Sequence, residues 1–230
     1  MLEMNQLHCV DCMEAMRDIP DKFFDLGIID PPYGIGKSVF SAGYGSKGNE
    51  KWKRKWDTPY EKENWNDDAP PYEYFYELFR VSKNQIIWGA NHFISRMPLD
   101  SPCWIVWDKR NGASSFADCE LAWTSFHSAV RKFEYLWNGF QKQAPEIRFH
   151  PTQKPVVLYE WILQKYAQPE DKILDTHAGS ASCAVACIRK GFDWFACEIS
   201  ENYCAKAQER IMQAYKEAEA ERAQMRFDDI

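Results

Sequence analysis

Short apolar runs alternate with helically spaced hydrophobic positions through the first two thirds of the chain. The apolar run over 26–29 is followed at once by Asp30 and two prolines, which predicts a buried strand that ends at Asp30. Aromatic and aliphatic residues at helical spacing over 72–81 predict a helix, and the apolar run over 85–88 predicts the strand after it. Three further strands are predicted over 103–107, 120–125 and 132–137, and the last two are expected to form an antiparallel pair.

The last third of the chain alternates regularly between helix and strand. Pro155 suits the first turn of a helix that continues to about residue 166. A strand over 173–175, a helix over 182–190, a strand over 194–198 and a final helix from 201 follow. This βαβα order is typical of a parallel sheet, so the expected fold class is α/β with a mixed, mostly parallel sheet.

One domain accounts for most of the chain, because 230 residues of which 45% are hydrophobic can bury a single large core. We expect this domain to cover 1–216 and a charged tail over 217–230 to fray. The segment 37–68 lacks periodicity and is too long for an idle loop, which indicates a functional loop. No apolar run approaches the roughly 20 residues of a membrane helix, and no signal peptide is evident, so a soluble cytoplasmic protein is expected.

Acidic residues outnumber basic ones, and the formal net charge of -6 argues against a uniformly basic surface for nucleic acid. Any contact with DNA is therefore expected to be local. One dense basic segment mixes cations with indole rings, a composition that suits phosphates and unstacked bases, although a charge run is more often a solvated face. This candidate DNA-binding segment consists of Lys51, Trp52, Lys53, Arg54, Lys55 and Trp56.

Eight cysteines are present, and most of them lie inside apolar runs, where a free thiol packs as a small hydrophobic group. Cys9 and Cys12 have the spacing of half a zinc site, but no second pair at ligand spacing follows. We therefore expect reduced cysteines and no bound metal.

A turn of small residues follows the strand predicted over 173–175. The turn Asp175-Thr176-His177-Ala178-Gly179-Ser180 leads into a helix, and Glu198 ends the next strand. Small residues let a ligand approach the backbone, and a carboxylate at the next strand end can accept hydrogen bonds from both hydroxyls of a ribose. A nucleotide-like cofactor site is one interpretation, and a tight connection in any doubly wound sheet is the other. The turn lacks the glycine patterns of dinucleotide-binding folds and P-loops, which disfavours hydride transfer and nucleotide hydrolysis.

A second candidate site, Asp30-Pro31-Pro32-Tyr33, lies at the end of another predicted strand, so both sites are expected at one edge of the sheet. An exocyclic amine on a nucleobase is a poor nucleophile because its lone pair is delocalised into the ring. Asp30 and the carbonyl of Pro31 could hold the two hydrogens of such an amine while Tyr33 stacks on the flipped base. The alternative interpretation is a rigid strand exit, since prolines stiffen the backbone.

Together these motifs resemble the beta group of DNA amino-methyltransferases, in which the catalytic motif precedes the cofactor motif. The approach over 18–25 leads into Asp30-Pro31-Pro32-Tyr33-Gly34 as it does in that family, and His150-Pro151-Thr152-Gln153-Lys154-Pro155 is a further signature. The resemblance is strong over 5–36 and 150–212 and weaker around 88–91 and 107–109.

The resemblance implies a Rossmann-like fold that binds S-adenosylmethionine, with helices on both faces of the sheet. It implies transfer of a methyl group from S-adenosylmethionine to N6 of adenine in DNA, without a covalent enzyme intermediate. Thr152 and Lys154 would lie near the carboxylate of the cofactor, and Asp11 near its adenine. The implied catalytic residues are Asp30, Pro31, Pro32 and Tyr33, and the implied cofactor residues are Asp11, Asp30, Thr152, Lys154, Asp175, His177, Gly179, Ser180 and Glu198.

Two departures concern the cofactor turn, where the resembled family usually has Asp-Pro-Phe-x-Gly-Ser-Gly-Thr. Thr176-His177 replaces Pro-Phe, and Ala181-Ser182 replaces Gly-Thr. His177 is expected to weaken cofactor binding or to make it pH-sensitive near the titration range of histidine. The segment 133–149 is short for a target-recognition region, so DNA recognition is assigned to the loop 37–68.

Methylation of N4 of cytosine is the nearest alternative, because the amine chemistry is the same and enzymes of that type prefer Ser at the position of Asp30. RNA or a protein glutamine amide as substrate would more often be accompanied by Asn there. An inactive DNA-binding protein of the same fold is a further alternative, which the presence of Asp30, Tyr33 and Glu198 disfavours. The resemblance also favours a homodimer, with the aromatic residues between Trp52 and Tyr76 as its interface. Restriction-modification, replication timing and protection of a viral genome all stay open as roles.

Overall fold

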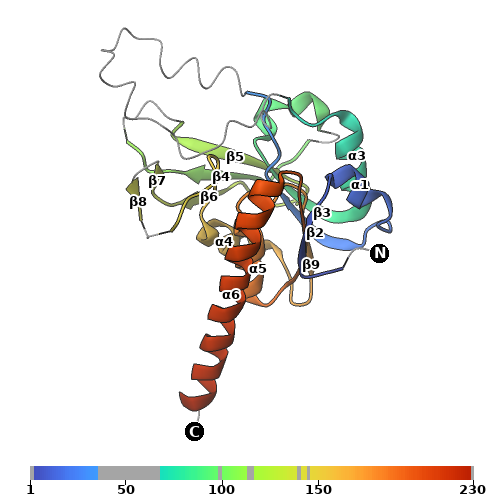
Figure 1. The fold of residues 1–230 in the computed structure, drawn as a ribbon. Helices are drawn as coiled ribbons and strands as arrows, with labels where there is room; N and C mark the ends of the chain where they lie inside the picture. Colours follow the sequence, from blue (N-terminus) through green and yellow to red (C-terminus); the bar gives the residue numbers. More distant parts are fainter. Residues whose placement is uncertain are drawn as a thin grey trace, which may run out of the picture.

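The computed structural model describes residues 3–35, 68–97, 100–112, 117–138, 141–143 and 146–228. An eight-stranded sheet forms the centre of this part, and helices pack on both of its faces (Figure 1). The sheet contains β1 (Gln6–Cys9), β2 (Phe24–Ile29), β3 (Ser82–Trp88), β4 (Trp104–Asp108), β5 (Cys119–Thr124), β6 (Arg131–Glu134), β9 (Lys172–Asp175) and β10 (Asp193–Glu198), while β7 (Trp137–Asn138) and β8 (Gln141–Lys142) form a separate hairpin. The helices are α1 (Cys12–Arg17), α3 (Tyr72–Val81), α4 (Val156–Tyr166), α5 (Ser182–Lys190) and α6 (Glu201–Asp228), with two 3₁₀ turns, η2 (Ala90–His92) and η3 (Ile94–Arg96).

The strand order is β1-β10-β9-β2-β3-β5-β4-β6, and β5 is antiparallel to both of its neighbours. The remaining pairs in this sheet are parallel, so the predicted mixed, mostly parallel sheet is confirmed. The expected antiparallel pair of β5 and β6 is wrong, because β6 pairs in parallel with β4. Since β3 and β4 occupy the two edges of β5, β6 is added at the outer edge of β4.

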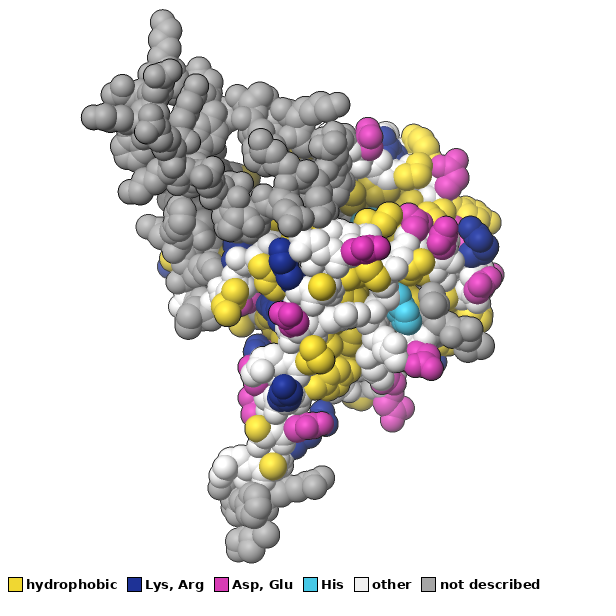
Figure 2. All heavy atoms as spheres, in the orientation of Figure 1, with side chains coloured by type: hydrophobic (Ala, Val, Ile, Leu, Met, Phe, Trp, Pro, Cys, Tyr) yellow, Lys and Arg dark blue, Asp and Glu magenta, His cyan; other side chains and the backbone are white. Residues whose placement is uncertain are grey.

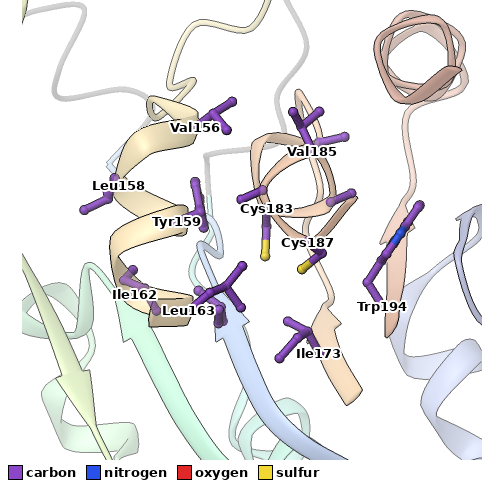
Figure 3. Close-up of a cluster of buried hydrophobic side chains, with 14 of the residues drawn as sticks. Val156, Leu158, Tyr159, Ile162, Leu163, Ile173, Cys183, Val185, Cys187 and Trp194 are labelled. Carbon is purple, nitrogen blue, oxygen red and sulfur yellow. The ribbon is translucent and has the colours of Figure 1, made fainter. Parts of the chain in front are cut away.

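Successive residues of the central strands contribute to different hydrophobic clusters, because side chains alternate between the two faces of a sheet. Ile28 and Ile86 pack in the cluster that includes α4, α5 and α6, whereas Ile29 and Ile87 pack in the cluster that includes α1 and α3. Figure 3 shows the first cluster, where side chains of α4 and α5 lie over Ile173 of β9. Each fully buried aliphatic side chain contributes roughly 1.5–3 kcal/mol, so both faces stabilise the sheet.

The helix boundaries follow the sequence pattern closely. The structure places α3 and α5 at the predicted residues, and α4 ends at Tyr166, shortly before Pro169. The final helix continues to Asp228, where a fraying tail was expected, because its alanine- and glutamate-rich sequence has high helix propensity. Figure 1 shows this helix extending beyond the sheet. The sequence did not predict β1 and α1, whose 4 and 6 residues are too short for a clear periodicity.

Both candidate motifs lie at the carboxyl ends of neighbouring strands. The chain leaves β2 just before Asp30, leaves β9 at Asp175 and leaves β10 at Glu198. From β2 the chain continues to β3 on one side, and from β9 it continues to β10 on the other side. The order of the strands therefore reverses between β2 and β9, and in open α/β sheets ligands bind at such a point.

The described surface carries no continuous basic face in the view of Figure 2, where Lys and Arg side chains alternate with Asp and Glu. Among the helices that the structure describes, none has the length and hydrophobicity required to cross a membrane. The basic segment over 51–56 lies outside the described residues.

Candidate functional site

A cavity of about 350 Å³ opens at the carboxyl ends of β2, β9 and β10. Small-molecule sites are commonly of roughly this size or larger. The cavity joins the two motifs that the sequence placed at one edge of the sheet. Of the predicted site residues, those that line it are Asp11, Asp30, Pro32, Thr152, Lys154, His177, Gly179, Ser180 and Glu198.

The other predicted residues lie beside the cavity or outside the described chain. Asp175 is buried behind the wall, where its carboxylate accepts a hydrogen bond of 3.1 Å from the backbone N–H of His177. Burial raises the pKa of Asp175 to about 7. Pro31 and Tyr33 belong to the segment that carries Asp30. The predicted DNA-binding residues Lys51, Trp52, Lys53, Arg54, Lys55 and Trp56 lie outside the described residues, and their role stays a prediction.

Glu198 connects two loops at the rim of the cavity. One carboxylate oxygen accepts a hydrogen bond of 2.8 Å from the backbone N–H of Gly179, and the other accepts one of 2.9 Å from Ser200. Gly179 has a φ of +50°, a conformation that favours glycine. A β-carbon there would lie in ordinary van der Waals contact with the ring of His150, at 3.5 Å, so the backbone conformation alone favours glycine.

The unusual residues of the turn form a chain of hydrogen bonds. The hydroxyl oxygens of Tyr74 and Thr176 lie 2.6 Å apart, and the Thr176 hydroxyl lies 2.9 Å from Nδ1 of His177. Burial lowers the pKa of His177 to about 4. The desolvated imidazole therefore stays neutral through the usual range of histidine, which argues against pH-sensitive binding in that range, while weaker cofactor binding stays a prediction.

His150 packs between the cofactor turn and the start of α6. Its ring meets Tyr203 in an edge-on contact at 4.4 Å between centroids, and its Nδ1 lies 3.2 Å from the hydroxyl of Thr152. Burial lowers the pKa of His150 to about 3, with smaller contributions from the cations Arg148 and Lys154. The sequence identified His150 only as part of a signature and assigned it no role.

The catalytic candidates Asp30 and Tyr33 form a closed triangle with Lys154. Oδ1 of Asp30 accepts a hydrogen bond of 2.9 Å from the Tyr33 hydroxyl and lies 2.6 Å from Nζ of Lys154. Lys154 also donates to the Tyr33 hydroxyl at 3.1 Å. Burial raises the pKa of Asp30 above its ordinary value, and the Lys154 ammonium opposes this shift. Lys154 lines the cavity, but its contact with the carboxylate of a cofactor stays a prediction.

Gly89 sets the position of the Tyr33 ring. Its φ of +69° lies in the left-handed region, and a β-carbon at this position would overlap the ring of Tyr33. His92, two residues after Ala90, stacks on the same ring with centroids 5.1 Å apart and an interplanar angle of 15°. The segment of weak sequence resemblance around 88–91 therefore supports the ring of Tyr33.

Glu120 of β5 is a site residue that the sequence did not reveal. Its carboxylate lies 3.1 Å from Nζ of Lys154, and it also forms an ion pair with Lys109 at the end of β4. Although burial raises the pKa of Glu120, the cations Lys154 and Lys109 lower it to about 2. The register of β4 and β5 brings Glu120 to this place, since Glu120 pairs with Trp107, two residues before Lys109, and the sequence gives no signal of that register.

Two serines and an arginine fix the start of α5. The hydroxyl of Ser182 donates a hydrogen bond of 2.8 Å to the carbonyl of Lys154, and Arg210 of α6 donates one of 2.7 Å to the carbonyl of Ser180. Arg210 also pairs with Glu146. These contacts join the signature around Lys154 to the cofactor turn, although more than 20 residues separate them in sequence.

Asp11 caps α1 as well as lining the cavity. Its Oδ1 accepts a hydrogen bond of 2.8 Å from the backbone N–H of Met13, as an N-cap carboxylate does. The described part of the chain contains no group of three or more His, Cys, Asp or Glu side chains arranged to hold a metal.

Comparison with known sequences gives a family match at the C-terminal half of the chain. The family model described as DNA methylase, of the N6/N4 type, matches residues 123–209. YubD of Escherichia coli (strain K12), which carries the name of a methylase, is 32% identical over 79 residues, or 31% of this chain and 35% of that protein. The type II methyltransferase M1.MboII of Moraxella bovis is 23% identical over 259 residues and covers 90% of this chain and 96% of that protein.

Comparison with solved structures identifies the fold. The crystal structure of the M1.HpyAVI-SAM complex has a TM-score of 0.53 at 19% identity and covers 89% of this chain and 98% of that one. The cytosine-N4-specific PvuII DNA methyltransferase has a TM-score of 0.56 at 11% identity and covers 93% of this chain and 92% of that one. The family match and the shared fold confirm the resemblance to amino-methyltransferases of the N6/N4 type and the predicted Rossmann-like methyltransferase fold.

Proposed function

We propose that the chain is an S-adenosylmethionine-dependent DNA amino-methyltransferase whose target is N6 of adenine. The observation that carries this proposal is the junction of the two motifs: Asp30 and Glu198 line one cavity, and Lys154 joins the catalytic segment to the signature before α4. A nucleotide-like ligand in that cavity would reach the carboxylate that is suited to hold a target amine.

The chemistry of the cavity fits S-adenosylmethionine. Glu198 accepts backbone hydrogen bonds from Gly179 and Ser200 and lies at the end of β10, where a carboxylate suits the two hydroxyls of a ribose. The left-handed turn at Gly179 gives a ligand access to the backbone. Asp11 and Thr152, from other segments, supply polar groups for the adenine and the amino-acid portion. When bound, the cofactor supplies an electrophilic methyl group.

Asp30 and Tyr33 would act on the target base. The carboxylate of Asp30 and the carbonyl of Pro31 accept hydrogen bonds from the amine and thereby restore the nucleophilicity of its nitrogen. Tyr33 presents an aromatic ring at the same place, and stacking on such a ring stabilises a base that has been flipped out of the duplex. Catalysis by this site would come mainly from orientation of the flipped base and polarisation of its amine.

Adenine is favoured over cytosine by Asp30, since the resembled N4-cytosine enzymes prefer Ser at that position. The fold does not discriminate, because the cytosine-N4-specific PvuII enzyme has a TM-score of 0.56 with this chain. Methylation of N4 of cytosine is therefore the second candidate function. It would use the same cavity and the same polarisation of an amine.

The test is incubation of the purified protein with unmethylated DNA and methyl-labelled S-adenosylmethionine, followed by digestion and mass identification of the nucleosides. We expect labelled N6-methyladenine, and we expect Asp30→Ala and Asp30→Asn to abolish it. Labelled N4-methylcytosine would keep the mechanism and refute the choice of base. Absence of label in DNA, with cofactor binding intact by calorimetry, would support the inactive binder and refute the enzyme.

Two further variants test the binding parts separately. Glu198→Gln should weaken binding of S-adenosylmethionine by at least about tenfold, because it removes the charge that orients both loops. Replacing Lys53, Arg54 and Lys55 by alanine should leave cofactor binding unchanged, weaken DNA binding and reduce its dependence on salt. Unchanged DNA affinity in the triple variant would exclude the basic segment as the DNA contact.

A further inference from the structure

Four charged side chains form a continuous chain behind the catalytic segment. Lys109 pairs with Glu120, Glu120 lies 3.1 Å from Lys154, and Lys154 lies 2.6 Å from Asp30. Lys109 directly follows β4, Glu120 lies in β5, Lys154 lies in the loop before α4, and Asp30 directly follows β2. With two acids and two bases, the chain carries no net formal charge.

Lys154 is the deepest member, with a side chain only 3% exposed. A buried ammonium is costly unless carboxylates and hydrogen bonds compensate it. Asp30 alone would suffice as a counter-charge, yet Glu120 contacts the same Nζ atom. Although burial lowers the pKa of Lys154, Asp30 and Glu120 raise it above its ordinary value. Keeping Lys154 charged therefore does not by itself explain the contact with the Glu120 carboxylate.

The proposed methyl transfer explains why a second carboxylate would lie beside Lys154. The nitrogen lone pair of the amine forms the new N–C bond, and the electron pair of the broken S–C bond stays on sulfur, which becomes a neutral thioether. Positive charge moves to the nitrogen until an N–H proton passes to the Asp30 carboxylate and then to water. An anion at Asp30 stabilises this positive charge, whereas a bare ammonium beside Asp30 would cancel much of the effect.

We propose that Glu120 is a positioning residue for methyl transfer, which neutralises Lys154 so that Lys154 orients Asp30 without cancelling its negative charge. Lys154 and Tyr33 both hold Oδ1 of Asp30, and this fixes the plane of the carboxylate. Lys109 anchors the far side of the Glu120 carboxylate. The inference rests on the proposed function. It adds Glu120, which lies outside the segments of resemblance, and gives a role to Lys109, which lies in the weak segment 107–109.

The charged and titratable groups around Asp30 come from several elements. Lys154 and Tyr33 contact it directly, while Glu120 of β5, Asp175 of β9 and Tyr159 of α4 act through their electrostatic interaction with it. Glu120 is the acid among them that also contacts Lys154. Removing its charge while keeping its shape therefore isolates its effect on Asp30.

The experiment is the pH dependence of methyl transfer by Glu120→Gln. We expect kcat to fall at least about tenfold, with KM for S-adenosylmethionine and for DNA changed by less than about threefold. We also expect the acidic limb of the kcat profile to move to lower pH, because the neighbouring negative charge no longer disfavours ionisation of Asp30. A purely structural role would lower the yield of folded enzyme without moving the acidic limb.

A readout independent of turnover is the infrared titration of the Asp30 carboxyl group, identified by its loss in Asp30→Asn. Its midpoint should fall in Glu120→Gln and stay unchanged in Glu134→Gln, which removes an exposed carboxylate that pairs with Lys132. In a Lys154→Met background, with kcat compared at a pH above the acidic limb of both proteins, Glu120→Gln should change kcat by less than about twofold, because its effect on the transfer step passes through the lysine.

An unchanged kcat, an unmoved acidic limb or an unmoved infrared midpoint in Glu120→Gln would overturn the proposal. Failure of the proposed function is distinguishable, since it would show as absence of methyl transfer in the unmodified protein. The infrared titration would still decide in that case whether Glu120 controls the charge state of Asp30.

Discussion

Replacement of His150 should make the protein less sensitive to mild acid. The imidazole is 8% exposed, packs on Tyr203 and lies against the turn at Gly179. Burial lowers its pKa from 6.5 to about 3. His150→Asn keeps a hydrogen-bond acceptor near the position of Nδ1 and removes the titrating group.

The free energy of unfolding depends on pH because His150 binds a proton more readily in the unfolded chain than in the folded protein. Below its ordinary pKa of 6.5, His150 takes up a proton in the unfolded chain but stays neutral in the folded protein until about pH 3. The free energy of unfolding therefore falls as the pH drops between these two values. At about pH 5 the expected loss relative to neutral pH is about 2 kcal/mol, and it approaches about 3 kcal/mol at about pH 4.

Urea denaturation at a series of pH values, followed by tryptophan fluorescence, measures this effect. The quantity of interest is the difference between the free energies of unfolding of the wild type and His150→Asn, because shared contributions of other titrating groups cancel. This difference should shrink by about 2 kcal/mol between neutral pH and about pH 5. His127→Asn removes an exposed imidazole and controls for loss of one histidine. A wild type–variant difference that stays constant with pH would refute the reasoning.

Three further substitutions test the packing of the site. Gly89→Ala places a β-carbon in the space of the Tyr33 ring and should lower kcat by more than about tenfold while leaving cofactor affinity by calorimetry unchanged. Lys154→Met leaves two carboxylates without their shared cation and should lower the free energy of unfolding by about 3–5 kcal/mol at neutral pH, measured in urea. Ala181→Gly relieves a left-handed alanine with φ 57°, worth roughly 1 kcal/mol, but removes a buried methyl worth about 0.8 kcal/mol, so thermal denaturation should show almost no change.

The sequence predicted most of the parallel half of the fold, although not β1 and α1, because local residues mark the other elements there. The strand at 173–175, the helix over 182–190 and the strand at 194–198 each combine an apolar run with a turn or proline boundary. The antiparallel half was placed less well. Which edge of β5 receives β4 and which receives β3 depends on contacts across the whole sheet, and no local pattern encodes that choice.

Some residues of the candidate site were also predicted from the sequence, and others were not. Asp30 and Glu198 were predicted because they lie at strand ends, where an acidic residue interrupts an apolar run. Glu120 was not predicted because it lies within a strand, where no motif or strand end marks it, and the fold alone brings it to Lys154. Gly89 was not predicted for a different reason. The ring of Tyr33, which leaves no space for a β-carbon at this position, lies more than 50 positions earlier in the sequence.

The two departures from the family pattern also follow from packing rather than from sequence alone. His177 and Thr176 are accommodated because Tyr74 of α3 reaches across to complete their hydrogen bonds, and the imidazole stays neutral in this environment. Cofactor affinity in this chain should therefore depend on the contact between α3 and the turn. Tyr74→Phe keeps the ring and removes its hydroxyl, so calorimetry should show weaker binding of S-adenosylmethionine with DNA affinity unchanged. Equal cofactor affinity in Tyr74→Phe would mean that the Thr176-His177 pair holds the turn without help from α3.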